Sequence, residues 1–315
     1  MRAENALALV GETPLVRLGR ASRESGALVL GKLEAYNPSG SVKDRAVLAM
    51  VRAAEEGGRL APGMSLVVAS AGNLALSAAV VAAVRGYRCV VVAPESAPAE
   101  WRRLVMGLGA EVVATPAADG MGGALRRAQQ EGRARPEAWV LSPFTDEAAP
   151  AGFAAMAEEI WRDTDGRVAR VVVGVGTAAT AAGLSAAFAA RGRSVRVVGV
   201  EPAEAPNLHG GGGQPHRIAG IGTGFVPPHW QAARLTESVA VSSADAVAEC
   251  RRLAAEEGLL VGPSSGAVVR AARLCARPGE VVVAVLADGG ERYLAQPGYL
   301  PEAGEGGAPT PGDGP

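Results

Sequence analysis

Short runs of apolar, often β-branched residues alternate with alanine-rich segments of helical length along most of the 315-residue chain. Within a run, apolar and polar positions do not alternate, which is typical of parallel strands covered on both faces. The pattern predicts strands at residues 28–35, 66–70, 88–93, 111–115, 138–142, 168–174, 194–201, 238–242 and 280–286. Repeated strand–helix units predict an α/β fold with two open, mostly parallel twisted sheets and helices on both faces.

Two further stretches have distinctive patterns. Residues 171–190 carry no charge, but glycines and many small residues interrupt them, so they are interpreted as a buried strand, a turn and a helix rather than a membrane span. Residues 295–315 are rich in Pro, Gly and Glu without periodicity, so they are predicted to form a disordered tail.

The composition excludes several classes of protein. The chain is 48% hydrophobic and 20% charged, with a net charge of −1, which argues against a broad electrostatic surface for nucleic acid or an anionic membrane. Three cysteines and three histidines show no metal-ligand spacing, so we expect no metal site and no disulfide framework. This cysteine usage fits a reducing, cytoplasmic environment.

Lysine is rare in this chain. Only Lys32 and Lys43 occur among the 31 Lys and Arg residues. A lysine in such a background is a candidate for amine chemistry, although survival by chance is an equal alternative. Lys43 begins a predicted helix, with Ser41 and Asp44 as a capping box, and shares the apolar face of Val47. Burial and the helix N-terminus would lower its pKa, unless the side chain extends to solvent.

Three turns between a strand and a helix are candidate binding loops. Asn73 follows the strand at 66–70, where helix amides bind anions, although Asn is also a common helix cap. Residues 174–179 match the pattern G-x-G-x-x-A and Glu201 ends the next strand, which indicates a phosphate ligand without distinguishing a dinucleotide from another phosphate. Ser264 lies in the third turn, as a cap or as a hydroxyl for a ligand.

Together, these segments resemble the cysteine synthase (O-acetylserine sulfhydrylase)/cystathionine β-synthase family of fold-type II pyridoxal-phosphate enzymes, from Gly11 to about Leu294. The segment Asn37–Arg45 is similar to the lysine motif of that family, and Gly176–Thr180 resembles its phosphate loop. Further similar segments are Gly11–Leu15, Val198–Pro206, His216–Pro227 and Asp288–Leu294.

The resemblance implies pyridoxal 5'-phosphate as cofactor, in place of a dinucleotide. Lys43 would be the Schiff-base lysine and the base and acid at the substrate Cα. Asn73 would contact the 3′ oxygen of the cofactor, and Ser264 would face its pyridine nitrogen. The implied cofactor-binding residues are Lys43, Asn73, Gly176, Thr177, Ala178, Ala179, Thr180 and Ser264. The implied substrate-binding residues are Ser70, Ala71, Gly72, Asn73, Leu74, Phe144 and Gly222.

The resemblance also implies a division into domains and an assembly. A larger domain would comprise residues 1–34 and 143–294 and hold the phosphate, and a smaller domain would comprise residues 35–142. A homodimer is expected.

The chain departs from the family pattern where the substrate carboxylate would bind. Ala71 and Leu74 replace residues with hydroxyls, and Pro143 precedes Phe144 in place of glutamine. Hydrogen bonds to a charge contribute roughly 1.5–3 kcal/mol each, so ordinary amino acids should bind more weakly. Ala178 and Ala179 replace glycines of the phosphate loop and are expected at negative φ.

The implied function is β-replacement on an O-activated L-serine or an analogue, via aminoacrylate, in amino-acid biosynthesis. The alternatives are a 2,3-diaminopropionate synthase-like enzyme, β-elimination as in serine/threonine dehydratases, and a catalytically weakened cofactor-binding partner protein. The expected partner is a small amino-acid substrate.

Overall fold

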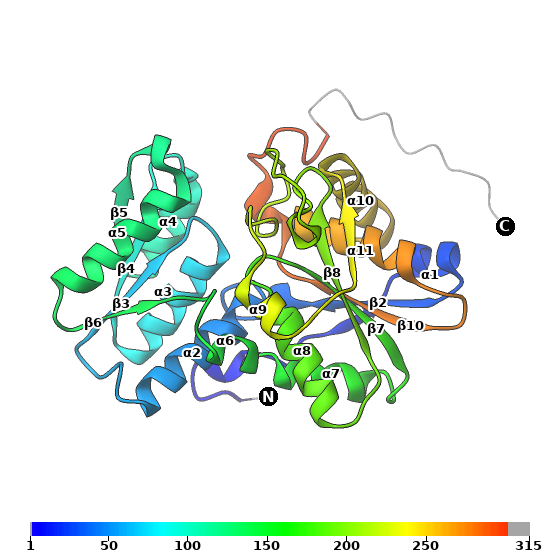
Figure 1. Ribbon diagram of the computed structural model, residues 1–315, viewed down its shortest axis with the longest axis horizontal. Helices are drawn as coiled ribbons and strands as arrows, with labels where there is room; N and C mark the ends of the chain where they lie inside the picture. Colours follow the sequence, from blue (N-terminus) through cyan, green and yellow to red (C-terminus); the bar gives the residue numbers. More distant parts are fainter. Residues whose placement is uncertain (1, 302–315) are drawn as a thin grey trace.

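The computed structural model describes residues 2–301 of the chain. Its ribbon has two lobes, each built around a β-sheet, and helices α2 (Lys43–Glu56) and α6 (Ala148–Ala151) run between them (Figure 1). The predicted fold class of two mostly parallel sheets surrounded by helices is confirmed.

Within the described residues, the larger sheet has the strand order β1-β2-β10-β7-β8-β9. Its strands are β1 (Leu15–Arg17), β2 (Leu28–Leu33), β7 (Val168–Gly174), β8 (Arg196–Pro202), β9 (Ser238–Val241) and β10 (Val281–Leu286). All pairs are parallel except β1 with β2, in which Leu15 faces Lys32. The sequence analysis did not predict β1, which has only three residues.

The smaller sheet is parallel and has the order β5-β4-β3-β6 in the described part of the chain. Its strands are β3 (Ser65–Ala69), β4 (Arg88–Pro94), β5 (Glu111–Thr115) and β6 (Ala138–Leu141). Every strand that the apolar runs predicted is therefore present, within a few residues of its expected ends.

The remaining helices cover the faces of the two sheets. They are α1 (Gly19–Ser25), α3 (Asn73–Arg85), α4 (Ala99–Gly107), α5 (Gly120–Ala134), α7 (Ala154–Asp163), α8 (Ala179–Ala190), α9 (Pro228–Ala232), α10 (Ser243–Glu257) and α11 (Pro263–Cys275). Short 3₁₀ turns are η1 (Ala6–Leu9), η2 (Glu34–Tyr36), η3 (Ala117–Asp119), η4 (Asn207–His209) and η5 (Gly290–Tyr293).

Strand β10 shows why its sequence lacks alternation. All six of its residues are buried. Val283 and Val285 belong to an apolar cluster that includes Leu184 of α8, whereas Val282 and Ala284 belong to a second cluster that includes residues of α10 and α11. Because both faces are covered, both sets of alternate positions must be apolar.

A buried ion-pair network connects β2, α2 and α7. Lys32 Nζ lies 2.7 Å from a carboxylate oxygen of Glu159 and donates to the carbonyl oxygen of Thr13 at 2.6 Å. Arg45 pairs with Glu159 at 2.8 Å and with Glu34 at 2.7 Å. Burial raises the pKa of Glu159, but the hydrogen bonds and charges of Arg45 and Lys32 outweigh it and lower this pKa to about 2. Lys32 thus has a structural role within the network.

The chain just before residue 302 is more ordered than predicted. Tyr299 is fully buried and its hydroxyl donates to Val261 O at 2.6 Å. Arg251 of α10 donates to three carbonyl oxygens of residues 298–300. The prediction of a disordered tail is therefore wrong for residues 295–301, because one aromatic side chain anchors them, and its remainder, 302–315, lies outside the described residues. The proposed domain boundaries at residues 34 and 142 stay a prediction.

No helix within residues 2–301 is long and apolar enough to cross a membrane. The uncharged stretch 171–190 forms most of β7, a turn and α8, as predicted.

Gly183 of α8 offers a test of close packing between α8 and the segment before α7. A Cβ at this position would lie 2.0 Å from Pro150 O and 3.0 Å from Phe153 Cβ. Overpacking costs about 1–3 kcal/mol, so Gly183→Ala should lower the melting temperature by about 2–5 °C, as measured by circular dichroism. Gly107→Ala, at the end of α4 with open space around it, is the matched control and should not lower it. Equal melting temperatures in the two variants would contradict this packing.

Candidate active site

The first turn of α2 is held against the end of β10. Val42 N donates to Ala287 O at 2.8 Å, and Ser41 forms an antiparallel bridge with Asp288. Lys43, the first residue of α2, is only partly buried, so a ligand can reach it. Dense packing around its amine lowers the pKa of Lys43, and the charge of Asp288 opposes this effect only in part. The predicted lowering of this pKa therefore has burial as its main cause.

Asp44 does not form the predicted capping box with Ser41. Its Oδ2 accepts from Ser39 N at 2.7 Å, and its Oδ1 accepts from the hydroxyls of Ser39 and, at 2.5 Å, Ser77. Ser77 lies on α3, so Asp44 connects the lysine turn to the helix that follows Asn73. The sequence pattern is local, and it could not reveal a partner 33 residues away.

The turn between β3 and α3 carries the predicted substrate loop. No side chain caps the start of α3, and Gly72 N donates to Ser70 Oγ at 3.1 Å. Ala71 and Leu74 pack against the apolar core. The helix-start amides therefore remain the groups of this loop that suit an anion.

The side chain of Asn73 is held by residues that sequence reasoning left without a role. Asn73 Nδ2 donates to Asp288 Oδ2 at 2.6 Å, and Asn73 Oδ1 accepts from Arg292. Tyr293 Oη also donates to Asp288 Oδ2, at 2.5 Å. The available signal was the family-like segment Asp288–Leu294, which marked these residues without indicating their contacts.

The glycine loop after β7 leads into α8 as predicted. A Cβ at Gly176 would lie 2.4 Å from Gly220 O, so the loop approaches a second backbone closely. Ala178 has φ 63° and precedes α8 in the left-handed conformation. The expectation of negative φ is therefore wrong for Ala178, whereas Ala179 lies within the helix. No side chain caps α8, so its first amides suit a phosphate.

Ser264 brings these loops together. It lies in the first turn of α11 and is 6% exposed. A Cβ built on Gly174 would lie 4.0 Å from Ser264 Cβ, and one built on Gly262 would lie 2.2 Å from Asp288 Oδ1. The phosphate-type loop, Ser264, and the segments of Lys43 and Asn73 thus meet at the carboxyl ends of the parallel strands, where open α/β sheets bind ligands.

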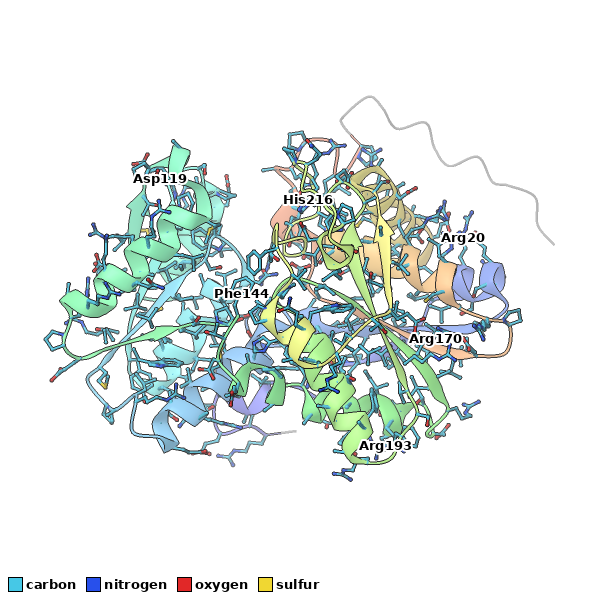
Figure 2. The ribbon with its side chains drawn as sticks, viewed as in Figure 1. Arg20, Asp119, Phe144, Arg170, Arg193 and His216 are labelled. Atoms are coloured by element: carbon cyan, nitrogen blue, oxygen red, sulfur yellow. The ribbon has the colours of Figure 1, made fainter. Side chains whose placement is uncertain are left out.

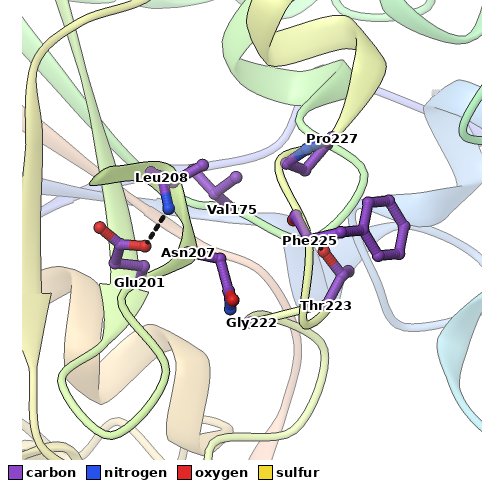
Figure 3. Close-up of a pocket in the computed structure, with 8 residues that line it drawn as sticks. All are labelled: Val175, Glu201, Asn207, Leu208, Gly222, Thr223, Phe225 and Pro227. Carbon is purple, nitrogen blue, oxygen red and sulfur yellow. Dashed lines mark hydrogen bonds between the residues drawn. The ribbon is translucent and has the colours of Figure 1, made fainter. Parts of the chain in front are cut away.

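Phe144 and Gly222, the remaining predicted substrate residues, lie beside this meeting point. Gly222 N donates to Val175 O at 3.0 Å, next to the phosphate-type loop. Phe144 lies between the two lobes (Figure 2), and its ring is 5.4 Å from that of Phe225. Figure 3 shows a small pocket that Gly222 lines together with Val175 and Phe225.

The contacts of Glu201 give no support to a dinucleotide site. Glu201 is 2% exposed, and its carboxylate accepts from Leu208 N at 2.8 Å and from Ser238 Oγ at 3.3 Å (Figure 3). These bonds hold the chain after β8. Within the described residues, no cluster of three or more His, Cys, Asp or Glu side chains could hold a metal ion.

The arrangement fits pyridoxal phosphate. Asp288 Oδ1 is buried without a hydrogen-bond partner in the described chain, beside a glycine that leaves the space open. The amine of Lys43 lies close enough to affect the pKa of Asp288, and the loops that meet here also offer the uncapped start of α8 and the buried hydroxyl of Ser264. These donors match an aldehyde, a phosphate and a ring nitrogen in one ligand.

Known proteins point to the same group. Residues 6–288 match the family model described as pyridoxal-phosphate dependent enzyme. A probable cysteine synthase of Bacillus subtilis (strain 168) is 40% identical over 298 residues, which cover 92% of this chain and 96% of that protein.

Two solved structures are similar throughout. A cysteine synthase from Entamoeba histolytica aligns with a TM-score of 0.91 and 32% identity, covering 97% of this chain and 94% of the other. An O-ureido-L-serine synthase aligns with a TM-score of 0.89 and 35% identity, covering 95% of this chain and 96% of the other. The predicted family and cofactor are confirmed, and the chain belongs to the family of pyridoxal-phosphate dependent enzymes, as an enzyme of the cysteine synthase type.

Proposed function

We propose that the protein catalyses β-replacement on an O-activated L-serine or a close analogue. The observation that carries this proposal is the partly accessible, pKa-lowered amine of Lys43 at the meeting point of the candidate cofactor loops. The relatives named as cysteine synthases support sulfide as a nucleophile, and the likeness to an O-ureido-L-serine synthase supports a less common one.

Bound pyridoxal phosphate supplies an electron sink for negative charge at the substrate Cα. Lys43 Nζ would hold the cofactor by its aldehyde carbon and, when free of it, would accept and return the proton at the substrate Cα. Burial keeps a fraction of this amine neutral, which both tasks require.

The other residues bind and orient. Backbone amides of residues 176–180, with the hydroxyls of Thr177 and Thr180, would hold the phosphate at the start of α8. Ser264 would make a neutral hydrogen bond to the ring nitrogen, so the ring would withdraw electrons less strongly than it would beside a carboxylate. This weaker withdrawal suits the loss of a β leaving group. Asn73 Nδ2 would donate to the ring oxygen.

The turn Ser70–Leu74 binds the substrate carboxylate mainly through backbone amides. Its two apolar side chains are half-buried against the core and carry no hydroxyl, so the site lacks hydroxyl donors at those positions. This loss suits a substrate that gains affinity from its β substituent. Gly222 and Phe144 border the space for that substituent.

The proposal also covers the oligomeric state of the enzyme and its location in the cell. We infer a homodimer in the cytoplasm, supported by the family and by cysteine usage. Analytical ultracentrifugation of the purified protein tests the dimer.

The function itself is tested by mixing the purified holoenzyme with O-acetyl-L-serine or O-phospho-L-serine, with and without sulfide. A change in the visible spectrum followed by cysteine formation supports β-replacement. Ammonia and pyruvate without cysteine would indicate elimination, and an unchanged spectrum with every activated serine would favour a binding protein.

Lys43 and Lys32 provide a matched pair for locating the cofactor. Borohydride reduction and peptide mass spectrometry should find the pyridoxyl group on Lys43 only, because Lys32 Nζ is paired with Glu159 at 2.7 Å. Lys43→Ala should abolish the visible band of the bound cofactor. The fraction of the Lys32→Met variant that folds should retain this visible band. A band that persists in Lys43→Ala refutes the assignment.

Restoring hydroxyls to the carboxylate loop should tighten binding of simple amino acids. In Ala71→Ser/Leu74→Thr, two added hydrogen bonds to a charge should lower the dissociation constants about 10-fold or more. Spectral titration with L-serine and L-cysteine measures this change. Ala99→Ser, on the exposed start of α4, is the control for a hydroxyl elsewhere. Unchanged constants would mean that the carboxylate binds elsewhere.

A further inference from the structure

We infer that Arg292 and Asp288 are positioning residues, which hold the side-chain amide of Asn73 in the one orientation that donates to the cofactor's ring oxygen. This inference rests on the proposed function, in which Asn73 Nδ2 contacts that oxygen. It assigns a role to the segment Asp288–Tyr293, which the proposed mechanism does not use.

The two partners of Asn73 have opposite chemistry. Arg292 Nη1 donates to Asn73 Oδ1, and a guanidinium has no acceptor. Asp288 Oδ2 accepts from Asn73 Nδ2 at 2.6 Å. If the amide rotated by 180°, its NH₂ group would face the guanidinium and its oxygen would face the carboxyl oxygen. Both contacts would become repulsive, so only the observed orientation is compatible with this pair.

The role of Asp288 does not depend on its charge. Burial raises the pKa of Asp288, whereas hydrogen bonds from Tyr293 and Asn73 lower it. In the ionised and the neutral state alike, Oδ2 can accept from Tyr293 Oη at 2.5 Å and from Asn73. Asp288 is 1% exposed, so water does not compete for these bonds.

Arg292 also relates Asn73 to the lysine turn. Its Nη2 donates to Ser39 O, four residues before Lys43. A Cβ at Gly40 would lie 2.5 Å from this nitrogen, so the guanidinium is closely packed against the turn. One side chain from the end of the larger lobe thus holds two loops of the cofactor site.

The orientation matters because Nδ2 carries two hydrogens. Asp288 takes one of them, and the second, which acts on Tyr293 Oη and lowers the pKa of Tyr293, is the one that an acceptor on a ligand would take. In the reversed orientation, the amide oxygen would face the ring oxygen, and two acceptors would repel each other. Without the pair, Asn73 would sample both orientations and bind the cofactor less well.

The test is a double-mutant cycle on cofactor binding, read by the dissociation constant of pyridoxal phosphate and by the visible spectrum. Arg292→Met and Asp288→Leu should each weaken binding about 10- to 100-fold and shift the visible spectrum in the same direction as Asn73→Ala. Asp288→Asn, which can keep an oxygen acceptor, should remain close to the unmodified protein. Arg167→Met, an exposed arginine paired with Asp165, is the control.

The decisive comparison is the double variant Asn73→Ala/Arg292→Met. Because Arg292 also bonds to Ser39 O, Arg292→Met should keep a small effect of its own, but if Arg292 acts chiefly through Asn73, the double variant should lie much closer to Asn73→Ala than the sum of the two single effects. Full additivity of the two effects, or an unmodified affinity in Arg292→Met, would overturn the inference. If Arg292→Met does not fold by circular dichroism, the cycle of Asp288→Leu with Asn73→Ala decides in the same way.

This test is separate from that of the proposed function. An unmodified protein that takes up no pyridoxal phosphate would refute the function. Normal uptake with additive effects would refute only the positioning role.

Discussion

The docking of the first turn of α2 against the end of β10 is the contact on which the site depends. Its backbone bonds, from Val42 to Ala287 and between Ser41 and Asp288, bring a lysine to the carboxyl ends of the larger sheet. A charged amine is poorly solvated there, because protein atoms pack densely around it, and its pKa falls. The same packing gives the amine neighbours that suit a phosphate and a ring. Reactivity and ligand binding therefore have a common structural cause.

The two lysines show that environment, and not residue type, decides which amine is available. Both lie near the junction of β2 and α2, and both are at least partly buried. Lys32 is fully buried and has an ionised partner, Glu159, whose pKa is held at about 2 by Lys32 and Arg45. Lys32 Nζ is held by this carboxylate and by the carbonyl oxygen of Thr13, so the amine is not free to bind a ligand. Lys43 has no comparable pairing in the described structure beyond the partial charge effect of Asp288. The rarity of lysine in the sequence pointed to both residues, and only their surroundings distinguish them.

Most of the fold could be predicted, because its central strands, such as β10, are continuous apolar runs with both faces covered, and that requirement is visible residue by residue. The failures share a different cause. Strand β1 has only three residues, which are too few to show a repeating pattern of apolar positions. Asp44 bonds to Ser77 across 33 positions, and Arg292 bonds to Asn73 across 219, so no local pattern contains either contact. Ala178 takes φ 63°, in the left-handed region that alanine disfavours, so residue preference predicted the wrong sign. For the site, motif similarity located the loops, but it could not tell which side-chain atoms were already occupied.

The loop after β3 combines two tasks that the structure assigns to different atoms. The amide of Asn73 is fixed by Asp288 and Arg292, which lie on the side of the larger sheet. The side chains of Ala71 and Leu74 instead pack on the apolar core. Substitutions at these two positions therefore leave the bonds of Asn73 in place. This separation explains how the chain can keep the residues expected to hold the cofactor while it departs from its family in those expected to hold the substrate. If the carboxylate donors that remain are backbone amides, which every residue type supplies, we expect selectivity to arise from contacts with the rest of the substrate, for which Phe144 and the loop of Gly222 are the candidates.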